Sequence, residues 1–316
     1  MKKFTKIFVI LGAVLCLCGS AVAAAGYLGG GFWELYDKTS PRITAMSAPQ
    51  NQEDLTTAVP SSQGQENLTF SPDEIDRLEF QLSSEDIVFR PSDDGQIHIR
   101  YFKRDDVTYT AYTEQSVNSD AGNTLIFTRN DASGSSQLFY FGFRYESDTP
   151  DVQVALPNGL SVDIITASGD VELSGISAAD LSISTVSGEV ELSQVQAASL
   201  TIGTTSGDMD LEQTTVSGET GLKTTSGDME LEDCSLNRAA VFSSVSGDLS
   251  GHALISGDVT IGTTSGDIEL DLSGSPAHAA GEISTTSGEL NLQGLQPKSD
   301  YSVSISTVSG DITLQH

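Results

Sequence analysis

The sequence has few basic residues: 15 Lys and Arg stand against 44 Asp and Glu, and the formal net charge is −29. Proteins that bind nucleic acid draw most of their affinity from clustered Lys and Arg. Because the sequence lacks such clusters, we expect no nucleic-acid partner. The acidic excess is typical of a soluble, self-repelling surface or of one that meets cations.

Cysteine is also scarce. The three cysteines are Cys16, Cys18 and Cys234, and the first two lie in an apolar N-terminal run. A single cysteine in the remainder excludes an intrachain disulfide framework there. Leu precedes both Cys16 and Cys18, where a lipoprotein cleavage site needs a small residue, so we expect no attached lipid.

The motifs of common enzyme classes are missing as well. No H-E-x-x-H, G-x-S-x-G or phosphate-loop spacing occurs in the sequence. His98 alternates with Ile97 and Ile99 and is expected to face solvent, and His278 lies in a predicted loop. The sequence therefore predicts no catalytic residues, no cofactor-binding residues and no enzyme.

The first 38 residues resemble a targeting or anchoring segment. Lys2, Lys3 and Lys6 precede an apolar run from Ile7 to about Phe32. The positive residues are expected to stay on the inner side of the membrane and the acidic bulk of the chain to lie on its outer side.

Two interpretations of this segment compete. An uncleaved helix of roughly 25 residues would span a bilayer, and Trp33 and Tyr36 suit its interface. The alternative is a signal peptide cleaved at the A-x-A sequence of residues 21–23. The first, which we favour, predicts a single-pass cell-membrane protein with its C-terminal domain outside; the second predicts a secreted protein.

Two further segments precede the repeats. Residues 39–66 are polar, contain prolines and show no period, which predicts a disordered linker. Residues 67–150 form a strand-rich part, because apolar and polar residues alternate in short runs. Ser71 begins the sequence SPDE, which predicts a short helical turn with Ser71 as its cap. The predicted strands are 77–82, 86–90, 96–102, 107–113, 123–129 and 137–145.

From residue 151 onward one five-residue word recurs eight times. It is TTSGD in three places and a close variant, such as TASGD or TVSGE, in the other five. The successive words are spaced by 19, 19, 20, 20, 19, 22 and 22 residues. A near-constant period of this kind indicates stacked repeat units. The serines of the Ser-Gly pairs are Ser168, Ser187, Ser206, Ser226, Ser246, Ser265, Ser287 and Ser309.

Apolar residues recur at fixed places around each serine, and this alternation predicts a strand, a Ser-Gly turn, a second strand and a short third side. Stacking eight such units at roughly 4.8 Å gives a body about 40 Å long. The predicted fold is all-β: a single-stranded, β-helix-like β-solenoid of about eight repeats of 19–22 residues at 151–316. Four residues before the serine stand Ile164, Ile183, Ile202, Leu222, Phe242, Ile261, Ile283 and Ile305; three after it stand Val171, Val190, Met209, Met229, Leu249, Ile268, Leu290 and Ile312; Leu recurs five after it, except at Gly251.

The glycine of each word is expected to be structural. It serves either a φ above zero or a close approach of the next repeat's backbone. The Thr two residues before the serine is expected to point inward at the corner and to form a hydroxyl ladder along the stack. The turn glycines are Gly169, Gly188, Gly207, Gly227, Gly247, Gly266, Gly288 and Gly310.

The repeated T-x-S-G-D-x-x-L, together with the leads DVQVALPNGLSVDIITASGDVEL and LEFQLSSEDIVFRPSDDGQIHIRY, resembles a bacterial putative-adhesin family with β-strand repeats. The similarity covers about Arg77 to His316. It implies a β-helix-like extracytoplasmic domain of unknown function, often behind one membrane segment and sometimes linked to envelope-stress systems. The family has no established catalytic residues to carry over.

Two acidic columns are the candidate binding surface. Acids stand two residues after each serine and, in five repeats, four residues after it, so both are expected on one outer face. Like charges one repeat apart repel, and Ca²⁺ could relieve that repulsion. The alternative, which we favour, is that the first acid bonds backbone amides of the turn and that both columns oppose edge-to-edge stacking. The calcium candidates are Asp170, Glu172, Glu189, Glu191, Asp208, Asp210, Asp228, Glu230, Asp267 and Glu269.

Two remaining features have structural interpretations. Cys234 occupies a position that is apolar in most other repeats, which predicts an inert buried thiol. The aromatic run at 137–145 is expected to seal the first repeat, with a contact to a partner or glycan as the alternative.

Taken together, these features predict a non-enzymatic cell-envelope protein that serves surface interaction or scaffolding. Its expected partners are an envelope protein or a surface glycan, with the membrane reached through the N-terminal helix. The alternatives are a regulatory or sensory component of an envelope-stress system and, with least support, a polysaccharide-acting enzyme. Because the sequence stops directly after the strand of the eighth word, we also expect that word to form the last repeat, whose end is either covered by a partner or used for end-to-end self-association.

Overall fold

The computed structural model describes residues 59–60, 65–102, 107–115, 122–131 and 151–316. The chain divides into two compact units, Met1–Gln52 and Glu53–His316, and all described residues belong to the second. The predicted membrane segment at 1–38, most of the predicted linker at 39–66 and the aromatic run at 137–145 lie outside the described residues. No helix in the described ranges is long and apolar enough to span a bilayer.

The described residues are all-β apart from one short 3₁₀ turn, η1 at Pro72–Glu74. Ser71 caps this turn as predicted, since its hydroxyl accepts from the amide of Asp73. The strands before the repeats are β1 Val59–Pro60, β2 Gln65–Phe70, β3 Arg77–Gln81, β4 Ile87–Pro91, β5 Ile97–Phe102, β6 Val107–Gln115, β7 Asn123–Asp131 and β8 Val152–Leu156.

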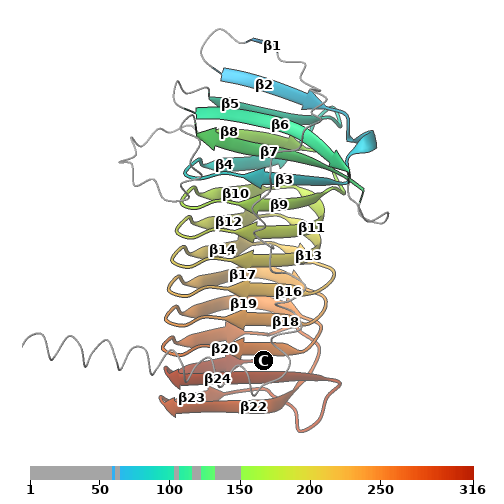
Figure 1. Ribbon diagram of the computed structural model, residues 1–316. Coiled ribbons are helices and arrows are strands. Elements are labelled where there is room, and N and C mark those ends of the chain that lie inside the picture. The colour runs from blue at the N-terminus through green and yellow to red at the C-terminus, as the bar shows by residue number, and fades with distance from the viewer. Residues whose placement is uncertain (1–58, 61–64, 103–106, 116–121, 132–150) are drawn as a thin grey trace, which may run out of the picture. The chain divides into compact units, whose positions relative to one another are not determined.

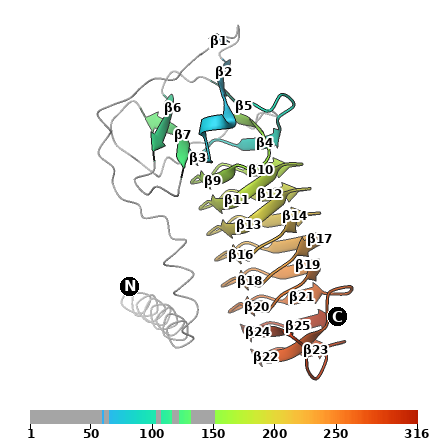
Figure 2. The same cartoon turned by 90° about the vertical axis from the view of Figure 1, so that its right-hand side faces the viewer.

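The repeats form two columns of parallel strands on either side of the Ser-Gly turns (Figures 1 and 2). The strands entering the turns are β9 Ser161–Ile165, β11 Ser177–Ser184, β13 Gln196–Gly203, β16 Thr220–Lys223, β18 Ala240–Ser243, β20 Val259–Gly262, β22 His278–Ser287 and β24 Tyr301–Ser309. The strands leaving them are β10 Val171–Ser174, β12 Val190–Ser193, β14 Met209–Glu212, β17 Met229–Leu236, β19 Leu249–Ile255, β21 Ile268–Asp271, β23 Leu290–Leu292 and β25 Ile312–Gln315. The short β15 Thr215–Val216 belongs to the third side, beside the start of β13 and the end of β17.

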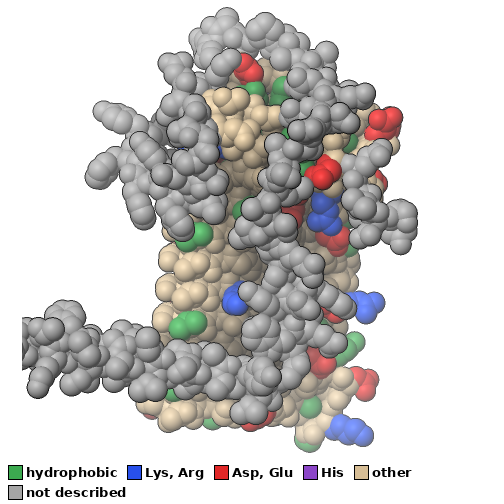
Figure 3. Space-filling view, in the orientation of Figure 1, with side chains coloured by type: hydrophobic (Ala, Val, Ile, Leu, Met, Phe, Trp, Pro, Cys, Tyr) green, Lys and Arg blue, Asp and Glu red, His purple; other side chains and the backbone are tan. Residues whose placement is uncertain are grey.

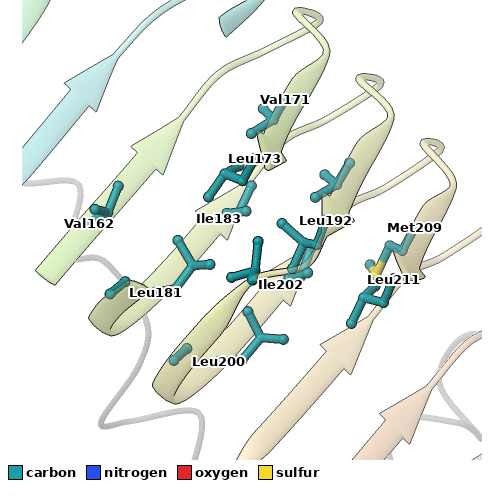
Figure 4. Packing of buried hydrophobic residues seen from close by; sticks show 14 of the residues in the cluster. Val162, Val171, Leu173, Leu181, Ile183, Leu192, Leu200, Ile202, Met209 and Leu211 are labelled. Atoms are coloured by element: carbon teal, nitrogen blue, oxygen red, sulfur yellow. The ribbon is translucent and has the colours of Figure 1, made fainter. Parts of the chain in front are cut away.

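Equivalent positions of successive words lie beside one another. Val190 pairs with both Val171 and Met209, and Ile183 pairs with Ile164 and Ile202. This register brings the apolar columns into one continuous interior between the two strand columns, where the side chains point toward one another (Figure 4). The predicted core residues are buried in every repeat except that of Ser287. The arrangement is consistent with the expected solenoid.

The parallel ladder also continues into the region before residue 151. Leu78 of β3 pairs with Val162, and Ile87 of β4 pairs with Val171. The segment Leu82 to Phe89, LSSEDIVF, is therefore a further copy of the word with Glu85 in place of glycine. β7 and β8 add parallel strands to β3 and β4, and the antiparallel strands β6, β5, β2 and β1 follow.

The order of the last repeats differs from their order in the sequence. β24 lies between β20 and β22, and β25 lies between β21 and β23. The prediction that the eighth word forms the last repeat is therefore wrong, because the seventh word, at Ser287, lies at the end. The two spacings of 22 residues allow this, since about three extra residues, each extending at most about 3.5 Å, let the chain step over one strand of roughly 4.8 Å and return.

Candidate functional site

The acidic residues two after each serine form a ladder that joins neighbouring repeats. The amide of Asp248 donates to Oδ1 of Asp228 at 2.8 Å, and the amide of Asp267 donates to Oδ1 of Asp248 at 2.8 Å. These carboxylates bond backbone amides, as the structural interpretation expects, but the amide that each one binds lies in the next repeat rather than in its own turn. The same bond joins Asp86 to Asp170, Asp170 to Glu189, Asp208 to Asp228, Asp267 to Asp311 and Asp311 to Glu289.

The second acidic column runs along the outer side of the strands that leave the turns. Glu191 lies between Glu172 and Asp210, and Glu230 follows. Burial first and the nearby Asp210 second raise the pKa of Glu189, so the two columns repel each other at this point. Charge is unevenly spread, since on the face in Figure 3 uncharged polar side chains and backbone cover the left side of the stack.

Calcium binding by these columns stays a prediction. In the part of the chain that the structure describes, no group of three or more His, Cys, Asp or Glu side chains is placed to hold a metal ion. The aspartates of the first column accept from backbone amides, as described above, and each strand of the second column carries a single carboxylate of that column.

The turn glycines are needed because successive repeats approach closely at this corner. A Cβ on Gly207 would collide with the carbonyl oxygen of Gly188, and one on Gly227 would collide with that of Gly207. None of the six turn glycines from Gly169 to Gly266 has a left-handed φ. Of the two reasons that the sequence left open, close approach is therefore the correct one.

The threonines of the words point inward as predicted, but their hydroxyls do not form the expected ladder. The hydroxyl of Thr204 accepts from the amide of Gly207 in its own turn at 2.9 Å, and Thr224 does the same for Gly227. The hydroxyl groups of Thr263 and Thr307 have no partner in the described structure. The threonine hydroxyl group caps its own turn in four words, those of Thr166, Thr185, Thr204 and Thr224.

Replacing Gly207 by alanine is expected to destabilise the unit by about 1–3 kcal/mol, because the new methyl group has no room beside the Gly188 carbonyl. Gly203→Ala is the matched control, since a Cβ there meets nothing within 4 Å. It should be neutral or stabilising by about 0.5–1 kcal/mol. Urea unfolding of both variants measures the difference, and equal stability of the two would contradict close packing at the turn.

Glu85 stands where the later repeats carry glycine, and its carboxylate is fully buried. It accepts from the amides of Ser83 and Ser84 at 2.9 and 3.1 Å, from the Tyr109 hydroxyl at 2.9 Å and from Arg129 at 2.7 Å. Burial raises the pKa of Glu85, but the Ser83 amide and the Arg129 guanidinium together lower it below its ordinary value of 4.5. The sequence analysis missed this group because Arg129 and Tyr109 lie far from Glu85 in the chain.

An open groove of about 590 Å³ lies on the outer side of β2, β4, β5 and β8. Its polar lining consists of Asn67, Arg90, His98, Arg100 and Gln153. Nε of Arg100 donates to the Asn67 side chain at 2.9 Å, and Arg90 pairs with Glu172. The terminal nitrogens of Arg100 have no hydrogen-bond partner among the described residues. We call this surface the arginine groove.

His98 lies on β5 and lines the arginine groove. Its side chain is partly exposed, in keeping with the expected solvent-facing position. Its Nε2 lies 2.9 Å from Oδ1 of Asp94. The Gln96 amide and then His98 lower the pKa of Asp94 to about 2. The carboxylate therefore stays charged beside the arginine groove and limits how positive that groove becomes.

Two other predictions concern single side chains. Cys234 is buried as expected, its thiol lies 3.2 Å from the Leu211 carbonyl, and burial raises its pKa to about 11. His278, predicted to lie in a loop, instead begins β22 and is fully buried. Its Nδ1 lies 3.0 Å from Nε2 of His316 and its Nε2 lies 2.9 Å from the Gly257 carbonyl, so it joins the last strands to the preceding repeat.

The register, the shared apolar interior and the amide ladder define a β-repeat protein built from stacked parallel strands. Residues 75–315 match the model of the Toastrack DUF4097 family. The match spans most of the chain, so this chain belongs to that family, and the resemblance to a β-repeat family of unknown function is confirmed.

The chain is also similar to two solved structures. One is a putative cell adhesion protein from Clostridium sporogenes, at 12% identity and a TM-score of 0.29, covering 79% of this chain and 98% of that chain. The other is a putative adhesin from Bacteroides fragilis, at 12% identity and a TM-score of 0.33, covering 81% of this chain and 98% of that chain. No curated protein matches the chain at a significant level.

Proposed function

We propose that this protein is a non-enzymatic, adhesin-like scaffold of the cell envelope that acts outside the membrane. The observation that carries the proposal is the amide ladder: the most regularly repeated acid of the sequence holds one repeat to the next. A stack tied together by carboxylate-to-amide bonds at most of its words suits a spacer that presents surfaces to a partner. In this proposal the 19–22-residue repeats form a single-stranded β-solenoid carried by the N-terminal helix.

The location is tested by protease treatment of intact bacteria that express the full chain with an epitope after His316. We expect the epitope to be lost from intact cells while a cytoplasmic control protein survives. Protection of the epitope until the cells are lysed would overturn an extracytoplasmic role. Cell-associated and released fractions distinguish the anchored form from the secreted alternative.

The arginine groove is the contact surface that we propose for a surface glycan. Its volume lies within the range of about 300–1,000 Å³ typical of ligand sites. The amides of Asn67 and Gln153 can exchange hydrogen bonds with sugar hydroxyls. The terminal guanidinium nitrogens of Arg100, which have no partner among the described residues, suit a carboxylate or phosphate on the glycan.

This contact is tested by binding of the full chain to immobilised neutral and anionic polysaccharides. Arg100→Ala is expected to weaken binding about tenfold, since a charge-assisted hydrogen bond contributes about 1.5–3 kcal/mol. Arg238→Ala removes the same charge from an exposed site outside the groove and should bind normally. Equal weakening by both variants would indicate a general charge effect and contradict a specific groove.

A further inference from the structure

The end of the stack formed by the seventh word is an open β-edge. β22 pairs with β24, and β23 pairs with β25. On their other side, β22 and β23 have no strand among the described residues, apart from a single bridge between Ala279 and Gln296. We call β22 and β23 together the terminal edge; it lies at the opposite end of the stack from β1 and β2 (Figure 1).

The terminal edge leaves the apolar interior uncovered. Leu290 is 47% exposed and Leu292 is 38% exposed. Their stack neighbours Ile312 and Leu314 are fully buried. Exposed apolar residues beside a row of unpaired backbone groups are the features by which a strand recruits another strand.

The backbone of β23 presents its hydrogen-bonding groups in a symmetric way. In β25, the neighbour of β23 in the stack, the amide of Ile312 donates to the carbonyl of Glu289, and Ile312 pairs with Leu290. The equivalent amide of Leu290 therefore faces the uncovered side, and the period of 2 places that of Leu292 there too. An antiparallel pair centred on Asn291 sets Leu290 of one copy opposite Leu292 of the other, which is a hydrogen-bonded pairing at both positions.

The outer acidic column, whose carboxylates would repel those of a second copy, does not reach β23. The outer acidic column carries Glu172, Glu191 and Asp210 on successive strands, but it ends in Thr313 and Asn291. A register centred on Asn291 places Glu289 opposite Gln293 of the second copy rather than opposite its own equivalent. The outer acidic column therefore adds no like-charge repulsion at this edge, although the net charge of the chain is −29.

Among the described residues, the opposite end of the stack offers no matching parallel strand pair. β6 is antiparallel to β7, β5 is antiparallel to β8, and β2 and β1 follow in antiparallel order. A second copy therefore cannot continue the parallel ladder head to tail. Pairing of the terminal edge with its own equivalent uses the same groups on both copies, and such an isologous contact closes as a dimer.

We propose that the terminal edge binds the terminal edge of a second copy of this chain, in an antiparallel pair centred on Asn291. The dimer buries Leu290 and Leu292 of both copies and joins the two interiors end to end. It places the N-terminal strands of the two copies at opposite ends of the joined stack. This deepens the proposed scaffold function, on which it rests, by naming the partner: two copies anchored in facing surfaces would meet at their terminal edges.

The test is sedimentation of the purified full chain in detergent over a range of concentrations. We expect a dimer that dissociates on dilution. Asn291→Lys places two like charges on the symmetry axis and should weaken the dimer by about tenfold or more. Thr313→Lys adds the same charge one strand further in and should leave the dimer unchanged.

A cross-linking experiment fixes the register. In this register the two Asn291 residues form a non-hydrogen-bonded pair, whose Cα atoms lie about 4.5 Å apart, within the range of about 4.4–6.8 Å that a disulfide needs. Asn291→Cys should therefore form a reducible dimer on mild oxidation, whereas Thr313→Cys, which retains the same native cysteines, should not.

Three results would overturn the proposal: a monomer at every concentration without an Asn291→Cys cross-link, a dimer insensitive to Asn291→Lys, or open-ended polymers. The protease assay on intact cells is independent of this contact. If the Asn291→Lys variant loses the dimer but its epitope is still removed by protease, the proposed location outside the membrane stands. If the epitope of the wild-type chain is protected on intact cells, the proposed function itself fails.

Discussion

Leu314→Ala is expected to destabilise the β-repeat unit by about 2–5 kcal/mol, the range for removing a buried leucine side chain, although Leu314 lies close to the end of the sequence. Its strand, β25, lies between β21 and β23, where Leu314 contacts the strands of Leu270 and Leu292. The side chain is fully buried. Truncation of this side chain therefore leaves a cavity between the last two repeats, instead of removing atoms from an exposed surface.

Leu292→Ala is the matched control for this prediction. Leu292 occupies the equivalent position in the terminal edge and is 38% exposed, so its truncation should cost about 1 kcal/mol or less. Both changes are measured by urea unfolding in the Asn291→Lys background, where self-association does not contribute. A larger effect of Leu292→Ala would mean that the eighth word, rather than the seventh, forms the last repeat.

Arg129→Ala is expected to destabilise the unit by about 3–5 kcal/mol at neutral pH, because it leaves the Glu85 carboxylate buried without its counter-charge. The Arg129 side chain is 11% exposed and that of Glu85 is 0% exposed. Arg90→Ala is the control: it breaks the pair with Glu172, whose side chains are 47% and 38% exposed, and should cost less than about 1 kcal/mol because solvent screens the pair.

The pH dependence of this effect has a defined sign. In the native protein the pKa of Glu85 lies below its ordinary value of 4.5. Its contribution to stability is therefore complete above 4.5 and is lost as the pH falls through the lower, folded value. In Arg129→Ala the pKa of Glu85 rises, so protonation relieves the unpaired charge.

The stability difference between the native chain and Arg129→Ala should accordingly be largest at neutral pH and shrink below pH 4.5. Unfolding curves at several pH values for both proteins measure this difference. A difference that does not change with pH would mean that the lost packing of Arg129, rather than the charge of Glu85, causes the destabilisation.

Some of the candidate sites depend on residues close together in the sequence, and others depend on residues that only the fold brings together. The acidic columns and the turn glycines could be located from the sequence, because each occupies a fixed offset from a Ser-Gly pair. The arginine groove could not, since Asn67, Arg90, Arg100 and Gln153 come from four strands whose order is set by pairing. Glu85 was missed for the same reason, because only the register with β10 shows that it stands in a glycine position.

The sequence by itself determined the strands of the repeats and their buried faces, since the alternation of apolar and polar residues is a local property that recurs in each repeat. Residues such as Ile183 and Leu192 are buried as that alternation predicted. Only the tertiary structure decided why the turns need glycine, which is the nearness of the Gly188 carbonyl to Gly207. It also decided the order of the last repeats, because every repeat offers the same apolar columns and either order buries them equally well. That choice depends on the lengths of the connections and on contacts such as His278 with His316, which join residues distant in the chain.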